Sequence, residues 1–161
     1  MTATYEPIST QTLGTAQASV TFSSIPATYT DLVLVFNGTT ASAQFMELRF
    51  NGDTATNYSA TRLSGNGSSA TSDRTSTQDV MFVGNLHTAQ TTNILQIMNY
   101  ANTTTFKTVL CRSNQAGAQV SARVGLWRKT PEAITTIFVR SGGGANFSIG
   151  CEFTLYGIKA E

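Results

Sequence analysis

The chain has 161 residues, of which 40% are hydrophobic and only 12% are charged, and its formal net charge at pH 7 is +1. Hydrophobic residues in this proportion can form one core, which argues against a disordered chain. The Lys and Arg residues are scattered rather than clustered, which argues against nucleic-acid binding through phosphate contacts. No apolar run is long enough to span a bilayer, so we expect no membrane partner. The simplest organisation is one domain over residues 1–161.

Apolar and polar residues alternate with a period of two along most of the chain, which predicts strands, and the abundant Thr, Ser, Asn and Gly favour strands and turns. Residues 1–13 are expected to be an N-terminal arm or an edge strand. The strand-like segments that follow are residues 18–25, 31–38, 45–53, 79–84, 93–101, 106–113, 120–127, 133–141 and 147–159. We therefore predict an all-β fold, a single antiparallel β-sandwich of jelly-roll type with about nine or ten strands.

Residues 52–78 have little apolar content, and we expect one long polar loop there. This stretch holds Asp53, Asn57, Tyr58 and Arg62, a combination that could stack on and hydrogen-bond to a sugar. The alternative is a structural role, in which the Asn-Gly pair at the start of the stretch makes a hairpin turn and the tyrosine ring packs over one end of the sandwich. Both interpretations stay open on the sequence alone.

The sequence holds no recognisable catalytic or metal-binding pattern. His87 is the only histidine, and its position predicts a solvated loop residue at the end of a strand. Trp127 ends another strand-like segment and is expected to be a half-buried anchor rather than a platform for a sugar ring. Cys111 and Cys151 lie in apolar stretches and are expected to be buried free thiols, with a disulfide left open. We therefore expect a protein that is not an enzyme and that uses no cofactor and no metal.

Five motifs occur along the chain in a fixed order: SIPATYTDLVLVFNG, LRFNGDTATNYSATRLSGNGSS, NYANTTTFKTV, GLWRKTPEAITTIFV and GGGANFSIGCEFTLYGIK. Together they resemble a family of small β-sandwich structural proteins of tailed bacteriophages, including cyanophages, over residues 23–159. The resemblance implies a virion component, either a capsid decoration (cement) protein or a tail-fibre or adhesin domain. It implies no catalytic residues.

A chain with room for one sandwich suits capsid decoration better than a tail fibre, which needs an attachment domain and a shaft. The resemblance thus implies a protein on the capsid surface, made in the host cytoplasm without a signal peptide, that bridges subunits of the major capsid protein and forms a homotrimer. Tyr5, Pro7 and Ile8 would then contact the shell or a neighbouring copy, unless residues 1–13 are an edge strand of their own sandwich. The alternative function is a tail-fibre or surface module that binds a host receptor or glycan.

Overall fold

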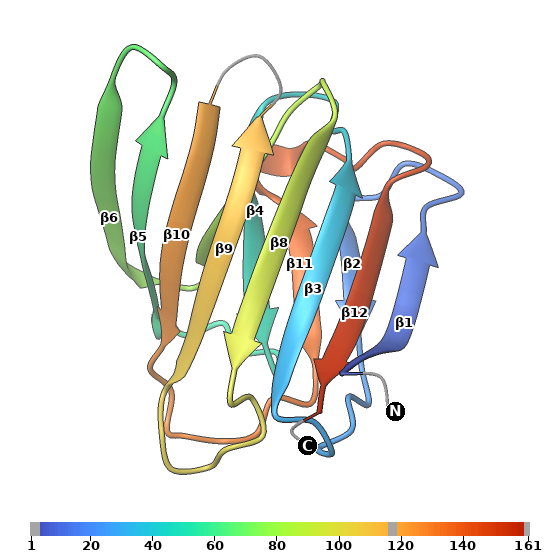
Figure 1. The fold of residues 1–161 in the computed structure, drawn as a ribbon, viewed down its shortest axis with the longest axis vertical. Coiled ribbons are helices and arrows are strands. Elements are labelled where there is room, and N and C mark those ends of the chain that lie inside the picture. The colour runs from blue at the N-terminus through green and yellow to red at the C-terminus, as the bar shows by residue number, and fades with distance from the viewer. Residues whose placement is uncertain (1–3, 116–118, 160–161) are drawn as a thin grey trace.

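The computed structural model describes residues 4–115 and 119–159, and it shows two antiparallel β-sheets packed face to face (Figure 1). The strands are β1 (Tyr5–Thr12), β2 (Ser19–Phe22), β3 (Asp31–Gly38), β4 (Gln44–Phe50), β5 (Tyr58–Gly65), β6 (Ala70–Gln78), β7 (Met81–Leu86), β8 (Thr91–Met98), β9 (Lys107–Gln115), β10 (Gln119–Trp127), β11 (Ile137–Ser141) and β12 (Glu152–Ile158). A short 3-10 helix, η1 (Gly142–Gly144), follows β11. The predicted all-β sandwich of jelly-roll type is confirmed.

The two sheets differ in size. The larger sheet has eight strands in the order β1-β12-β3-β8-β9-β10-β5-β6, and the smaller one has four in the order β2-β11-β4-β7. Figure 1 looks onto the outer face of the larger sheet, with β6 at its left edge, β1 at its right edge and the smaller sheet behind. The first and last strands of the chain, β1 and β12, are neighbours, so strands far apart in sequence complete the sheet.

The described residues form twelve strands rather than the predicted nine or ten. The prediction of one polar loop over residues 52–78 was also wrong. After a turn, the chain forms β5 and β6, which pair as an antiparallel hairpin at the edge of the larger sheet. The loop prediction relied on the scarcity of apolar residues. An edge strand such as β6 is held by backbone hydrogen bonds to one neighbour and exposes both faces, so it needs no apolar side.

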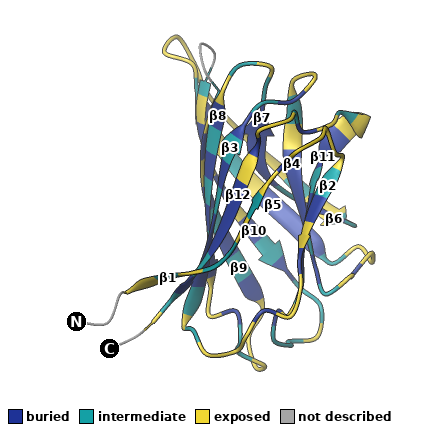
Figure 2. Ribbon diagram, turned by 90° about the vertical axis from the view of Figure 1, so that its right-hand side faces the viewer, coloured by how far each residue is buried: buried dark blue, intermediate teal, exposed yellow. Residues whose placement is uncertain are grey.

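The core lies between the two sheets, where the inward residues are buried (Figure 2). Phe36, Phe147 and Phe153 form one aromatic cluster, with ring centroids 4.9 to 5.5 Å apart. Cys111 and Cys151 are buried free thiols, as the sequence predicted. Burial raises the pKa of the Cys111 thiol to about 12, so this group is protonated at neutral pH and is not a nucleophile.

Strand β10 buries small and polar residues and exposes apolar ones. The inward residues are Ser121, Arg123, Gly125 and Trp127, and the outward ones are Val120, Ala122, Val124 and Leu126. Trp127 explains this orientation: its large indole lies in the core, and strand alternation then turns Arg123 inward as well. The neighbouring strand β5 behaves alike, with Arg62 and Ser64 inward and Leu63 outward. This half of the larger sheet is therefore apolar outside and polar inside.

Candidate functional site

Four residues singled out in the sequence meet at one end of the sandwich. The carboxylate of Asp53 accepts hydrogen bonds from Trp127 Nε1 at 2.6 Å, from Asn57 Nδ2 at 2.9 Å and from the backbone N–H of Ala55 at 3.0 Å. The Tyr58 ring stacks on Trp127 with the two ring centroids 6.3 Å apart. Because both rings are buried, neither offers a face to a sugar. These contacts describe a structural role: they fasten the turn before β5 to the end of β10.

The charged form of Asp53 is stabilised by this arrangement. Burial raises the pKa of Asp53, but the hydrogen bonds from Asn57, Trp127 and Ala55, together with the charge of Lys129, outweigh burial and leave the pKa below its usual value of 3.8. A carboxyl group whose pKa is lower in the folded than in the unfolded state stabilises the fold above its unfolded pKa. That contribution is lost as the pH falls through the folded pKa.

Acid should therefore destabilise the protein in part through Asp53. We expect the free energy of unfolding to fall as the pH drops from about 5 toward 2, and to fall less steeply in an Asp53→Asn variant, which has no carboxylate to protonate. The variant should also be less stable at pH 7, because the amide has only one oxygen to accept the hydrogen bonds. Urea unfolding followed at several pH values measures both effects. An identical acid slope in the two proteins would contradict the assignment.

Arg62 lies apart from the Asp53 cluster. It projects from β5 toward the space between the sheets, where its Nε donates to Asp73 Oδ2 on β6 at 2.7 Å. Its guanidinium carbon lies 5.8 Å from the centre of the Phe45 ring on β4. The sequence grouped Arg62 with Asp53, Asn57 and Tyr58, but the structure does not bring the four together on one surface.

The described part of residues 1–13 is an edge strand, since β1 pairs along its length with β12. Tyr5 is 54% exposed and packs edge-on against Tyr156, whereas Ile8 is half-buried against the core. The pairing register shifts just after Pro7, which has no N–H to donate to a ladder and is tolerated at a sheet edge. Within residues 4–115 and 119–159, one side of β1 has no partner strand, and contact of Tyr5 with another molecule stays a prediction.

Reactive side chains are dispersed over the described residues. His87 follows β7 in a turn, where its Nδ1 accepts a hydrogen bond from the Ala89 N–H at 3.1 Å, as expected of a loop histidine. In residues 4–115 and 119–159, no three side chains among His, Cys, Asp and Glu gather closely enough to hold a metal ion. The same part of the chain contains no helix that is long and apolar enough to cross a membrane.

The outer side of the larger sheet carries an apolar surface over β5, β10, β9 and β8, which we call the outer apolar face. It consists of Leu63, Ile94, Leu110, Val120, Ala122 and Val124. Leu63, Val120 and Val124 are 61%, 63% and 51% exposed. The strand register places these residues side by side, because Ala122 lies opposite Leu63 and Val124 lies opposite Leu110. Isolated exposed apolar residues are common, but a contiguous set indicates a binding surface.

Part of this face is hollowed into a shallow groove of about 760 Å³ between β6 and β8. None of the described residues that line the groove is aromatic, so a sugar ring has nothing to stack on. Two polar groups of its lining are already paired: the Thr92 N–H donates to Asn114 Oδ1 at 3.0 Å, and the Thr92 hydroxyl donates to Asn37 Oδ1 at 2.7 Å. The charged side chain in the lining is Arg112. The groove is therefore suited to apolar contact more than to a polar ligand.

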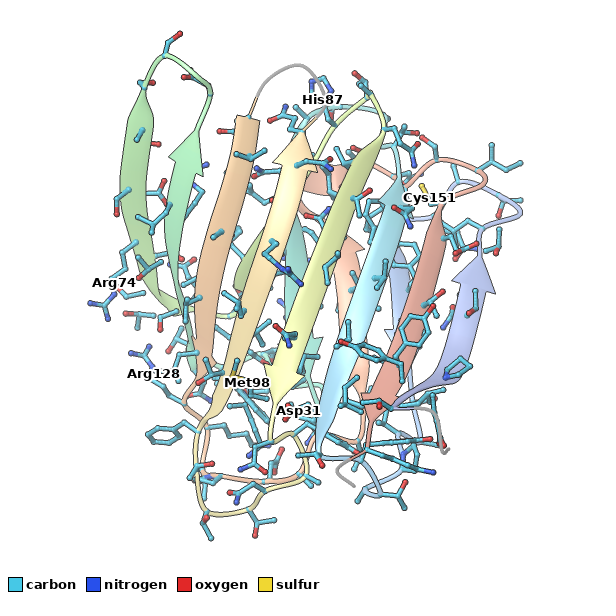
Figure 3. The ribbon with its side chains drawn as sticks, viewed as in Figure 1. Asp31, Arg74, His87, Met98, Arg128 and Cys151 are labelled. Atoms are coloured by element: carbon cyan, nitrogen blue, oxygen red, sulfur yellow. The ribbon has the colours of Figure 1, made fainter. Side chains whose placement is uncertain are left out.

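Charged side chains stand at the margins of the outer apolar face. Figure 3 shows Arg74 on the edge strand β6, Arg128 just beyond the end of β10 and Asp31 at the start of β3. Arg112 lies within this face, in register with Ala122 and Ile94, so the face combines apolar residues with an arginine. Protein–protein interfaces have a similar composition, because arginine is enriched in them and charged residues stand at their rim. We therefore regard the outer apolar face as the candidate functional site.

The sequence predicted the strands β8, β9 and β10 of this face, whereas β5 was expected to be part of a polar loop. In residues 120–127, alternation read in the usual way would bury Val120 and Val124 and expose Arg123. Trp127 was the better indicator of the buried side of this strand, because it has the largest side chain of the strand. Arg123 lies on the same side of the strand as Trp127 and is therefore buried as well.

Comparison with known proteins adds a likeness of fold. No family model matches the chain, and no curated protein is similar to it in sequence. Among solved structures, the chain is similar to the galectin LEC-6 of Caenorhabditis elegans, with 9% sequence identity over 94% of this chain and 96% of that chain and a TM-score of 0.40. At this identity and TM-score the likeness carries no conclusion about function. The fold class, an antiparallel β-sandwich, follows from the two sheets of the structure itself.

Proposed function

We propose that this protein is a non-enzymatic structural component of a phage virion, a capsid decoration protein that docks on the major capsid protein through its outer apolar face. The observation that carries the proposal is the exposure of Leu63, Val120 and Val124 on one continuous surface. The partner, the major capsid protein, is inferred from the resemblance of five sequence motifs to phage structural proteins. Burial of apolar side chains contributes about 25 cal/mol per Å², so such a face gains free energy only when a partner covers it.

The low charge of the chain suits this role. A formal net charge of +1 and one charged residue, Arg112, in the groove lining leave apolar burial as the main driving force. Docking on the shell would then be only weakly sensitive to salt, unlike binding steered by charge.

Bridging neighbouring shell subunits needs a second contact, and the sheet topology offers one. The outer apolar face lies toward the β6 edge of the larger sheet, whereas Tyr5 lies on the opposite edge strand β1. Tyr5 is exposed, and only one side of β1 is paired with another strand of the described residues. One copy would thus touch the shell with one part of the sheet and a second copy of itself with the β1 edge. In a homotrimer this edge would meet a different surface of the neighbouring copy, because a closed ring of three is built from heterologous contacts.

Purified virions of the phage that encodes this chain test the proposal. Quantitative mass spectrometry should find the protein in copy numbers comparable to those of the major capsid protein. A handful of copies per particle would contradict capsid decoration and favour the alternative, a receptor- or glycan-binding module on the tail. Binding of the purified protein to a glycan array would favour the same alternative.

A further inference from the structure

The space between the sheets is polar where β5 and β10 turn their polar residues inward. Asn85 on β7 is the centre of a buried network: its Nδ2 donates to Ser121 Oγ at 3.1 Å, its backbone oxygen accepts from Asn93 Nδ2 at 2.9 Å, and its Oδ1 accepts from Arg123 Nη2 at 3.0 Å. Ser121 in turn shares a hydrogen bond of 2.8 Å with Ser113. Each of these residues is buried.

Arg123 is incompletely satisfied in this network. It is 4% exposed, it takes part in no ion pair among the described residues, and its Nε has no hydrogen-bond partner there. Its guanidinium carbon lies 4.5 Å from the centre of the Phe45 ring, a cation–π contact that replaces part of the lost hydration. Burial, followed by repulsion from Arg62, lowers the pKa of Arg123 to about 10, so the group is still charged at neutral pH. A buried charge without a counter-charge is costly and calls for an anion.

A pocket of about 290 Å³ opens beside this charge, at the end of the sandwich where β4, β5 and β7 meet the ends of β9 and β10. Its lining includes Phe45 and Asn85, and both of these residues contact the Arg123 guanidinium. Arg62 and the amide side chains of glutamines on β4, β9 and β10 complete the polar part of the lining. Guanidinium and amide groups supply hydrogen-bond donors, which are the groups that anions bind.

The charges around the pocket do not cancel. Arg62 and Arg123 both lie against the Phe45 ring, and Asp73 neutralises one of them through its ion pair with Arg62. One positive charge remains in a region screened from water. A singly charged anion would balance it, whereas a phosphate dianion would overcompensate.

We propose that this pocket binds a carboxylate group, with Arg62 and the glutamine amides at its opening and the Arg123 charge behind Phe45 and Asn85. A planar carboxylate matches guanidinium donors in shape and in charge. The group could be carried by an acidic side chain or by an acidic sugar, since both present the same chemistry to the pocket. The proposal does not depend on the virion role, because it rests on the interior of the sandwich and not on the outer apolar face.

Nuclear magnetic resonance titration of the labelled full chain tests the proposal. Sodium glutarate represents an acidic side chain, sodium glucuronate represents an acidic sugar, and sodium chloride at equal ionic strength is the reference. We expect saturable shifts of the Asn85 side-chain amide and of the Arg123 Nε–H signal with at least one carboxylate. Arg123→Met should weaken that binding by about tenfold or more, because it removes the charge that the carboxylate balances.

Arg123→Met is expected to fold, because it removes a buried charge that has no counter-charge among the described residues and keeps an apolar side chain in place of the aliphatic stem of arginine. Lys159→Met also removes one positive charge, but Lys159 follows β12, pairs with Glu6 and lies outside the pocket lining, so this variant is the matched control and should bind as the unmodified protein does. If Arg123→Met does not fold, Arg62→Gln gives an independent test and should also weaken binding. A response to glutarate alone or to glucuronate alone supports the proposal and identifies the source of the carboxylate. The proposal is overturned if neither carboxylate shifts these signals more than sodium chloride does. It is also overturned if a folded Arg123→Met variant binds the carboxylate as tightly as the unmodified protein.

Discussion

Replacing Trp127 by alanine is expected to lower the free energy of unfolding by about 4 kcal/mol or more, which is a large part of the stability of a domain of this size. Trp127 is 2% exposed and packs against Phe50 and Tyr58, so its removal leaves a cavity between the sheets. It also removes the indole N–H that donates to the buried carboxylate of Asp53 at 2.6 Å. Loss of packing and loss of a donor to a charged group act in the same direction.

Trp127→Phe separates the two contributions. Phenylalanine keeps an aromatic ring in the core and lacks the N–H, so this variant should lose about 1–3 kcal/mol from the missing hydrogen bond to the Asp53 carboxylate, in addition to a smaller packing cost. Urea unfolding followed by circular dichroism at pH 7 measures both variants. If Trp127→Ala were as stable as the unmodified protein, Trp127 would not be the anchor that sets the orientation of β10.

If the outer apolar face docks on the capsid as proposed, Val124→Asp should greatly weaken that docking while leaving the fold intact. Val124 is 51% exposed on the outer apolar face, in register with Leu110, so an aspartate there is well hydrated in the free protein and costs little stability. In the docked complex the same carboxylate would be buried without a partner, which costs several kcal/mol. We therefore expect affinity for purified shells to fall by about a hundredfold or more.

The matched control for Val124→Asp is Thr21→Asp, which adds the same charge at an exposed position of β2 on the smaller sheet. Co-sedimentation with shells that lack the protein measures both variants. The proposal predicts loss of binding for the first and unchanged binding for the second. Equal binding by both would show that the outer apolar face is not the docking surface, and loss by both would point to a general effect of charge.

Much of the architecture could be predicted from local pattern. Alternation with a period of two located nine of the strands and the fold class, and the apolar surroundings of Cys111 and Cys151 predicted buried thiols. The hairpin of β5 and β6 could not be found in this way. Its second strand exposes both faces, so no alternation marks it, and its pairing with β5 comes from the backbone.

The candidate site was less accessible to sequence analysis than the fold. Asp53, Asn57, Tyr58 and Arg62 have the composition of a sugar site, yet three of them form a structural cluster and the fourth lies elsewhere between the sheets. Composition says which groups are present, but it carries no information on whether they point to solvent or to the core. That depends on the neighbours of each strand.

The sequence by itself determined that this chain forms a β-sandwich, where most strands run and which turns join them, because these features depend on residues that are close along the chain. Only the tertiary structure decided which side of β10 faces inward. Alternation shows that the two sides of a strand differ, but the side that is buried follows from the long-range contacts of Trp127 with Asp53 and Tyr58. Those contacts turn Arg123 into the interior and Val124 toward solvent, and so create both the outer apolar face and the polar pocket behind it.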